Sequence, residues 1–129
     1  IRSSIDDHIM HSEKGLVSLE TVKKIEKTKL NNGRIIAVGT TTLRLLESAA
    51  LSNGTLKPFS ADTNIFIKPG FNFNVVDVLL TNFHLPKSTL MLLVSAFSGA
   101  EKIKKIYQDA IKNEYRFFSY GDVSLLYKK

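Results

Sequence analysis

Apolar and polar positions follow two periods along this chain, and the periods predict strands and helices in alternation. Short apolar or alternating segments predict strands at residues 9–17, 34–38, 64–67, 77–80 and 123–127. Apolar positions three or four apart predict helices at residues 19–30, 43–50, 88–97 and 100–115, and a loop is expected at 51–63. This order favours an α/β domain whose sheet is mainly parallel, with helices on both faces.

Local sequence marks both ends of one predicted helix, and composition predicts the burial of another. Ser18 is a candidate N-cap for the helix at 19–30, and Gly33 is suited to the left-handed position after its end. The helix at 88–97 is apolar nearly all round, so it should be buried on several sides. The chain offers little surface to cover it and begins with Ile1 rather than Met, so a further segment of the fold is expected elsewhere.

Composition narrows the choice of partner. Eighteen basic against twelve acidic residues give a net charge of +6, which fits a polyanionic partner such as RNA about as well as it fits ordinary solvated helix faces. The absence of cysteine fits a reducing compartment such as the cytoplasm. The longest apolar run, residues 90–94, is far shorter than the ~20 residues of a membrane helix, so no membrane association is expected.

Two turns lie where a predicted strand runs into a predicted helix, a common place for ligands in α/β proteins. In the first, Gly39-Thr40-Thr41, N–H groups and hydroxyls can hold a phosphate or carboxylate; a tight turn with a threonine N-cap explains it equally well. The turn lacks the P-loop lysine and the dinucleotide-binding spacing. Arg44, one turn further, can clamp an anion or pair with Glu47.

The second turn carries a histidine at the expected sheet edge. His84 can move protons near neutral pH, and the alternative is a structural histidine bonded to the backbone. Asn82 and Lys87 flank it as candidate contacts for polar ligand groups, although Asn82 can also serve as a cap. Ser88 opens the following helix, so its hydroxyl and N–H group are expected at the same mouth.

Weaker candidates lie near both ends of the chain. His8, His11 and Glu13 are residue types that bind zinc or iron, but only His11 and Glu13 share a face of an extended segment. A substrate contact is therefore favoured and no metal is expected. Asp122 can bond a ribose hydroxyl or simply lie in a turn. Tyr120 can stack on a base, although core packing is the commoner role of neighbouring aromatic residues.

Several strings, in order along nearly the whole chain, resemble one known family. They are MHSE at 10–13, GRIIAVGTTTLRLLES at 33–48, IFIKPG at 65–70, VVDVLLTNFHLPKSTLMLLVSAFSG at 75–99 and YRFFSYGD at 115–122. They are similar to the C-terminal part of the S-adenosylmethionine:tRNA ribosyltransferase-isomerases of queuosine biosynthesis. The strings TNFHLPKSTL and RFFSYGD are the most distinctive.

The resemblance implies a fold and an activity. Family members insert a β-barrel domain into an α/β domain, so residues 1–129 are expected to be the last portion of a partial, Rossmann-like domain without the barrel. Members use S-adenosylmethionine as a co-substrate. They transfer its ribosyl group to an aminomethyl-deazaguanine base in tRNA and isomerise it, giving epoxyqueuosine and releasing adenine and methionine. The implied partner is tRNA.

This chemistry needs a group that moves a proton and anchors for the methionine carboxylate. His84 is the expected base or acid, and Thr40, Thr41 and Ser88 are expected to hold a carboxylate or ribose. Further substrate contacts are expected from the other candidates, namely His11, Glu13, Arg44, Asn82, Lys87, Tyr120 and Asp122. Two other classes stay open: a nucleotide- or RNA-binding fragment without activity of its own, and a different nucleotide-binding α/β enzyme.

Overall fold

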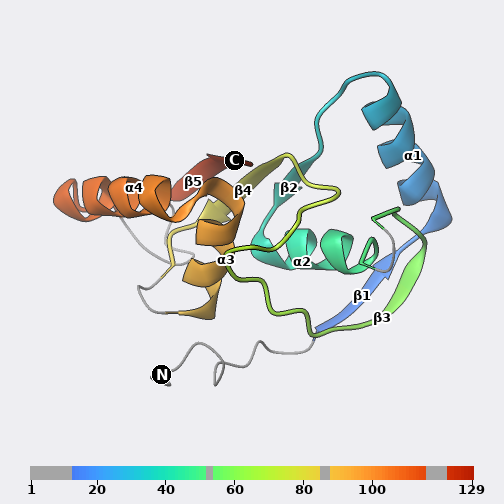
Figure 1. Cartoon of the computed structure of the whole chain (residues 1–129), viewed down its shortest axis with the longest axis horizontal. Coiled ribbons are helices and arrows are strands. Elements are labelled where there is room, and N and C mark those ends of the chain that lie inside the picture. The colour runs from blue at the N-terminus through green and yellow to red at the C-terminus, as the bar shows by residue number, and fades with distance from the viewer. Residues whose placement is uncertain (1–12, 52–53, 85–87, 116–121) are drawn as a thin grey trace.

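The computed structural model describes residues 13–51, 54–84, 88–115 and 122–129, which form two small sheets and four helices (Figure 1). In chain order the elements are β1 (Glu13–Val17), α1 (Leu19–Leu30), β2 (Ile36–Val38), α2 (Thr40–Ser48), β3 (Phe59–Thr63), β4 (Val78–Asn82), α3 (Thr89–Ser98), α4 (Ala100–Lys112) and β5 (Val123–Tyr127). One sheet pairs β1 with β3, and the other has the order β2-β4-β5. α2 contacts strands of both sheets and joins them. None of these described helices is long and apolar enough to cross a membrane.

Local sequence sets both ends of α1, with one difference from expectation. Ser18 is the N-cap: its backbone is extended, and its Oγ accepts a hydrogen bond from the Thr21 N–H at 3.1 Å. The left-handed residue after the helix is Asn32 (φ 61°), not Gly33 as predicted. Asparagine tolerates this conformation. Gly33 is needed instead for close approach, because a Cβ there would lie 2.6 Å from the Thr28 side chain.

The prediction of a mainly parallel sheet is wrong. β2 and β4 are parallel, with Ala37 opposite Leu79, but β5 is antiparallel to β4, and β1 is antiparallel to β3. The reason lies in the connection from β4 to β5. A single crossover helix returns the chain to the start of a strand, whereas α3 and α4 in succession bring it back to the end of β4, where Val123 pairs with Asn82. The parallel pair still places two carboxyl ends side by side.

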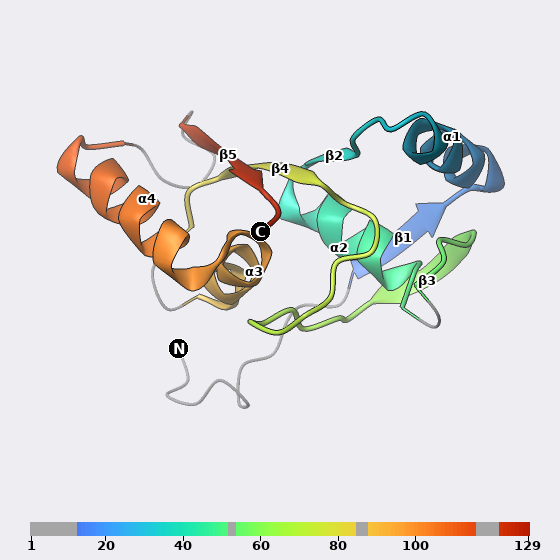
Figure 2. The same cartoon turned by 45° about the horizontal axis from the view of Figure 1, so that its top comes forward.

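In the described part of the chain, helices cover one face of the three-stranded sheet, so the prediction of helices on both faces is wrong there. α2 and α3 lie on the same side of this sheet (Figure 2). The strand residues on that side are buried, and we call them the covered face: Ala37, Leu79, Thr81, Ser124 and Leu126. Five large apolar side chains on the other side are 50% to 66% exposed, and we call them the open face: Ile36, Val38, Val123, Leu125 and Tyr127.

One predicted strand is wrong, and one observed strand lies where a loop was predicted. Residues 64–67 form no strand; their apolar run reflects core packing, since Ile67 is only 1% exposed. The strand of this region is β3, which falls within 51–63. Its middle residues are exposed and it is held by pairing with β1, so its hydrophobic pattern carries no signal. Other boundaries move by a few residues, and α4 ends at Lys112 rather than at residue 115.

Candidate functional site

A cavity of about 290 Å³ lies at the carboxyl ends of β2 and β4. It is lined by Val38, Gly39, Thr40, Thr41, Leu80, Thr81, Asn82, His84 and Val123. Open α/β sheets commonly hold ligands at this edge. Four of the predicted site residues, Thr40, Thr41, Asn82 and His84, therefore meet around one cavity. The roles assigned to them stay predictions.

One wall of the cavity is the turn from β2 into α2. Gly39 has a φ of 92°, which L side chains rarely adopt, although a Cβ there would meet nothing within 4 Å. Its N–H donates to the Leu80 carbonyl at 2.7 Å and ties the turn to β4. α2 begins at Thr40, so its predicted start at residue 43 is wrong, and the N-cap is Gly39 rather than a threonine. A first helical turn has N–H groups without acceptors inside the helix, so this wall suits an anion.

Another wall carries His84, which follows the end of β4 and is 8% exposed. Its Nε2 lies 3.2 Å from the Thr81 hydroxyl, and its backbone N–H donates to the Tyr107 hydroxyl at 2.9 Å. Burial lowers the pKa of His84 below its ordinary 6.5, so the imidazole is neutral at neutral pH. A neutral imidazole can accept a proton on one nitrogen while the other donates. The histidine thus has both a place at the cavity and a bonded backbone.

Arg44 is not among the residues that line this cavity. The residue is 3% exposed, and its Nη2 donates to the Ile65 carbonyl at 3.3 Å and the Thr63 carbonyl at 3.5 Å. It borders a much smaller hollow of about 20 Å³ together with Gly15 and Thr41. The contacts to carbonyls hold the chain after β3 against α2. An anion clamp by Arg44 at the 290 Å³ cavity is therefore not what the geometry favours.

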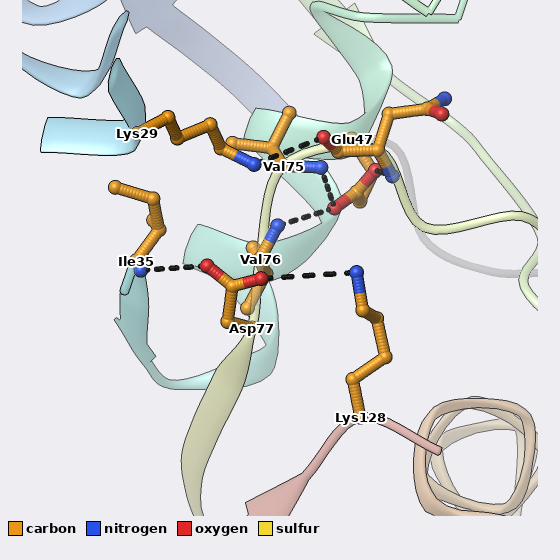
Figure 3. A network of polar contacts seen from close by, with 8 residues as sticks. Lys29, Ile35, Glu47, Val75, Val76, Asp77 and Lys128 are labelled. Atoms are coloured by element: carbon orange, nitrogen blue, oxygen red, sulfur yellow. Dashed lines mark hydrogen bonds and ion pairs between the residues drawn. The ribbon is translucent and has the colours of Figure 1, made fainter. Parts of the chain in front are cut away.

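Glu47 ties α2 to the segment that leads into β4 (Figure 3). It is 0% exposed, and its carboxylate accepts hydrogen bonds from the N–H groups of Asn74 (2.7 Å), Val75 (3.0 Å) and Val76 (2.9 Å). The sequence predicts Glu47 only as the alternative partner of Arg44, whereas the structure shows these backbone partners. Its place on the apolar face of the predicted helix was a signal that it is buried.

Asp77 extends the same network just before β4 (Figure 3). Its Oδ2 accepts a hydrogen bond from the Ile35 N–H at 2.9 Å, and its Oδ1 lies 3.7 Å from the Lys128 Nζ. Glu47 therefore fixes α2 to the segment before β4, and Asp77 fixes that segment to the chain before β2. Because α2, β2 and β4 all contribute to the cavity, the two carboxylates hold its walls in place.

The sequence and the fold both match known proteins. A family model described as queuosine biosynthesis protein matches residues 2–126. The chain belongs to this family. It is 60% identical over 121 residues to the S-adenosylmethionine:tRNA ribosyltransferase-isomerase of Bradyrhizobium diazoefficiens, covering 94% of this chain and 33% of that protein. The enzyme of the same name from Zymomonas mobilis is 60% identical over 124 residues, covering 96% of this chain and 36% of that protein.

A solved structure of the family has the same fold. The crystal structure of S-adenosylmethionine tRNA ribosyltransferase from Thermotoga maritima superposes with a TM-score of 0.76 at 46% identity, covering 85% of this chain and 38% of that one. The resemblance found in the sequence strings is thus confirmed. This member of the queuosine biosynthesis family spans about a third of the length of the curated relatives described above.

The other predicted contacts either are not among the residues that line the cavity or lie outside the described residues. Ser88 is the N-cap of α3, and its Oγ accepts a hydrogen bond from the Met91 N–H at 3.3 Å. Asp122 is half-buried and directly precedes the cavity residue Val123. His8, His11, Lys87 and Tyr120 lie outside the described residues, and Glu13 is described only as the first residue of β1. Within the described ranges, no three His, Cys, Asp or Glu residues gather as metal ligands would.

Sequence reasoning missed two side chains that hold His84. Thr81 lies on the covered face of β4 and reaches the imidazole, and Tyr107 comes from α4. The helical period of residues 100–115 puts Tyr107 on the same side as the buried Ile103 and Ala110, and Tyr107 is 5% exposed. The period gave no indication of its partner, because the contact joins residues 23 positions apart.

Proposed function

We propose that this chain forms part of the S-adenosylmethionine site of a tRNA ribosyltransferase-isomerase. The reaction moves the ribosyl group of S-adenosylmethionine onto an aminomethyl-deazaguanine base in tRNA and isomerises it, giving epoxyqueuosine, adenine and methionine. The observation that carries the proposal is the cavity where the first turn of α2 and a buried histidine share one lining. Relatives named for this activity, at 60% identity, support the choice of reaction.

The two walls suit different parts of the co-substrate. The first turn of α2, with Thr40 and Thr41, offers N–H groups and hydroxyls to the methionine carboxylate or a ribose hydroxyl. Asn82 adds an amide that can both donate and accept. His84, kept neutral by burial, is the proposed base for the proton on the carbon beside the sulfonium, whose positive charge acidifies that C–H bond. The resulting imidazolium can return a proton to the departing adenine.

The partner we propose is tRNA, and the location we propose is the cytoplasm. Nucleic-acid phosphates bind lysine and arginine side chains, and the net charge of this chain is +6. Exposed lysines gather on two helices: Lys23, Lys24 and Lys27 on α1, and Lys102, Lys104 and Lys105 on α4. Both helices also carry acidic residues, so we expect a salt-sensitive contribution to binding rather than all of the affinity.

We further propose that residues 1–129 are the C-terminal part of the α/β domain of a longer enzyme whose inserted β-barrel is not in this chain. The relatives are about three times as long. The open face supports the proposal, because five large apolar side chains are 50% to 66% exposed there. Strands that are apolar on both faces are typical of sheets covered on both sides. The rest of the enzyme would then cover this face and add groups to the site.

An NMR titration of the isotopically labelled chain with S-adenosylmethionine tests the site. We expect the amide resonances of Gly39, Thr40, Thr41 and His84 to shift, because these residues line the cavity. Resonances of α1 should stay in place. S-adenosylhomocysteine, which lacks the sulfonium charge, is the control ligand. Shifts confined to another surface, or none at millimolar ligand, would contradict binding at this cavity.

A second candidate function is binding without catalysis, which the one-third coverage of the relatives favours. Adenine release in the presence of substrate tRNA separates the two. If the chain binds S-adenosylmethionine but only a full-length relative releases adenine, this chain is a binding unit that needs the rest of the enzyme. The role of His84 is tested in a full-length relative, where unchanged turnover after replacing the matching histidine by alanine would exclude it as the base.

A further inference from the structure

Tyr107 reaches the site from an element that does not line it. It lies on α4, which follows α3 after a single glycine, Gly99, and which packs against α3. The residue is 5% exposed, and its hydroxyl accepts a hydrogen bond from the backbone N–H of His84 at 2.9 Å. A side chain behind the cavity thus contacts the residue that carries the imidazole.

The His84 N–H needs such a partner. β4 ends at Asn82, so the sheet ladder supplies no acceptor for an amide two residues later. His84 is 8% exposed, which leaves little room for water to take that place. A buried N–H group without an acceptor is costly, so most are paired. Tyr107 provides the acceptor through tertiary packing.

The ring of Tyr107 holds the residue before the histidine as well. It meets Phe83 edge-on, with ring centroids 5.3 Å apart and an interplanar angle of 72°. Phe83 is 2% exposed and also contacts the Tyr115 ring at 5.8 Å. One tyrosine therefore fixes two consecutive residues after β4, by a hydrogen bond to His84 and by ring packing on Phe83.

The imidazole is held from the other side by the covered face of the sheet. Its Nε2 lies 3.2 Å from the Thr81 hydroxyl, and the Thr81 carbonyl accepts a hydrogen bond from the Ser124 hydroxyl at 3.2 Å. β4 and β5 thus fix the ring while α4 fixes the backbone. Two independent attachments leave few orientations open to His84.

We propose that Tyr107 is a positioning residue, which sets the orientation of His84 at the cavity through the backbone hydrogen bond and the ring contact. Tyr107 does not line the cavity, so it acts through His84 and not on a ligand. The inference rests on the proposed function only in taking His84 as the group that the site uses. The attachment itself can be measured without any ligand.

The test compares Tyr107→Phe with Tyr127→Phe in this chain by NMR. The first change removes the accepting oxygen and keeps the ring. The second removes a hydroxyl from a tyrosine that is 50% exposed on the open face. In Tyr107→Phe we expect the His84 amide to exchange with solvent about tenfold faster, as for the loss of one hydrogen bond. We also expect the imidazole Cε1–H resonance of His84 to move. In Tyr127→Phe both should stay as in the unchanged protein.

The unchanged protein provides a measurement that does not depend on the folding of a variant. Its His84 amide should be protected from exchange, although it lies beyond the end of β4. If that amide exchanges as fast as in an unfolded chain, the proposal is overturned. It is also overturned if Tyr107→Phe and Tyr127→Phe give the same exchange rate of the His84 amide and the same imidazole resonance. A merely structural role of Tyr107 would lower the thermal midpoint but leave the imidazole resonance of the folded variant in place.

Ligand titration distinguishes a failure of this inference from a failure of the proposed function. If S-adenosylmethionine causes no shifts but Tyr107→Phe moves the His84 signals, the positioning role stands and the proposed ligand is wrong. Suppose instead that S-adenosylmethionine shifts the cavity resonances of the unchanged protein and of Tyr107→Phe with the same Kd, and that the two proteins have the same His84 signals. The ligand then stands, and the positioning role of Tyr107 is overturned.

Discussion

Both faces of the three-stranded sheet carry large apolar side chains, but the two faces have opposite surroundings. The covered face is on the side of the sheet where α2 and α3 lie (Figure 2), and its residues Ala37 and Leu79 are 0% exposed. On the open face, Val38 is 66% exposed and Leu125 is 51% exposed. β5 shows the contrast within one strand, because Leu125 and its neighbour Leu126, at 2% exposure, point to opposite sides. Composition alone would favour the wrong face as the buried one, because the covered face includes Thr81 and Ser124 while all five open-face side chains are apolar.

The difference in exposure between the two faces shows which face contributes to the core of the described chain. The covered face is part of the hydrophobic core that also contains residues of α2 and α3. The site draws on both faces, since Thr81 reaches His84 from the covered face while Val38 and Val123 of the open face line the cavity. The apolar side chains of the open face stay 50% to 66% exposed in the described part of the chain. Contiguous exposed apolar patches of this kind usually mark an interaction surface. Stability should therefore respond to changes on the covered face, and association to changes on the open face.

The largest effect is expected from shortening the leucine of the covered face. Leu126→Ala should lower the free energy of unfolding by about 2–5 kcal/mol, because it leaves a cavity in the core. Leu125→Ala, its neighbour on the open face, should change it by less than about 1 kcal/mol. Urea unfolding followed by circular dichroism measures both. Equal losses in the free energy of unfolding for the two variants would show that the two faces do not differ in burial.

The second-largest effect is expected at Glu47, whose carboxylate ties α2 to the segment before β4. Glu47→Gln keeps the shape of the side chain but replaces one accepting oxygen by a donor that faces backbone N–H groups. We expect a loss of about 1–3 kcal/mol in the free energy of unfolding, since at least one buried N–H loses its acceptor. The control is Glu20→Gln, where the side chain is 78% exposed and only an i,i+4 pair with Lys24 is lost. If Glu47→Gln were as harmless as this control, the bonds to Asn74, Val75 and Val76 would not be stabilising.

These contrasts also show how far the hydrophobic pattern predicts the fold. Residues 19–30 and 123–127 match α1 and β5, because an amphipathic stripe with an N-cap and a short, mostly apolar run are strong local signals. Strand direction could not be predicted, since a period of two is the same in parallel and antiparallel pairs. β3 gave no apolar signal because its middle residues are exposed. The open face could not be recognised, because a strand that is apolar on both sides looks the same whether or not helices cover it.

The residues of the candidate site also divide into those that the sequence predicts and those that it does not. Thr40, Thr41, Asn82 and His84 could be predicted because each lies at or just beyond the end of a predicted strand, and strand ends meet at one edge. Tyr107 and Glu47 could not, because their roles depend on backbone N–H groups far away in the sequence. Arg44 shows another limit: its place near a helix N-terminus suggests an anion clamp, but the sequence gives no sign of the Thr63 and Ile65 carbonyls that tertiary packing brings to its guanidinium.

A smaller loss in the free energy of unfolding is expected as the pH is lowered. It comes from His84, which Thr81 of the covered face contacts. Burial lowers the pKa of folded His84, whereas the unfolded chain takes up its proton near pH 6.5. Below that value the unfolded state binds the proton more readily, so stability should fall between pH 6.5 and the lowered pKa of the folded state. His84→Gln should flatten this part of the profile of unfolding free energy against pH. An unchanged slope in His84→Gln would mean that another group causes it.

The smallest effect on stability, and the clearest on association, is expected on the open face. Val38→Thr combined with Leu125→Thr keeps residues that suit strands but makes the surface polar. The free energy of unfolding should change by no more than about 1 kcal/mol, since both side chains are already half or more exposed. Binding of an apolar dye and concentration-dependent sedimentation should both fall, because the apolar patch is interrupted. If they stay as in the unchanged protein while stability drops sharply, the open face is buried in solution and the contrast between the two faces does not hold.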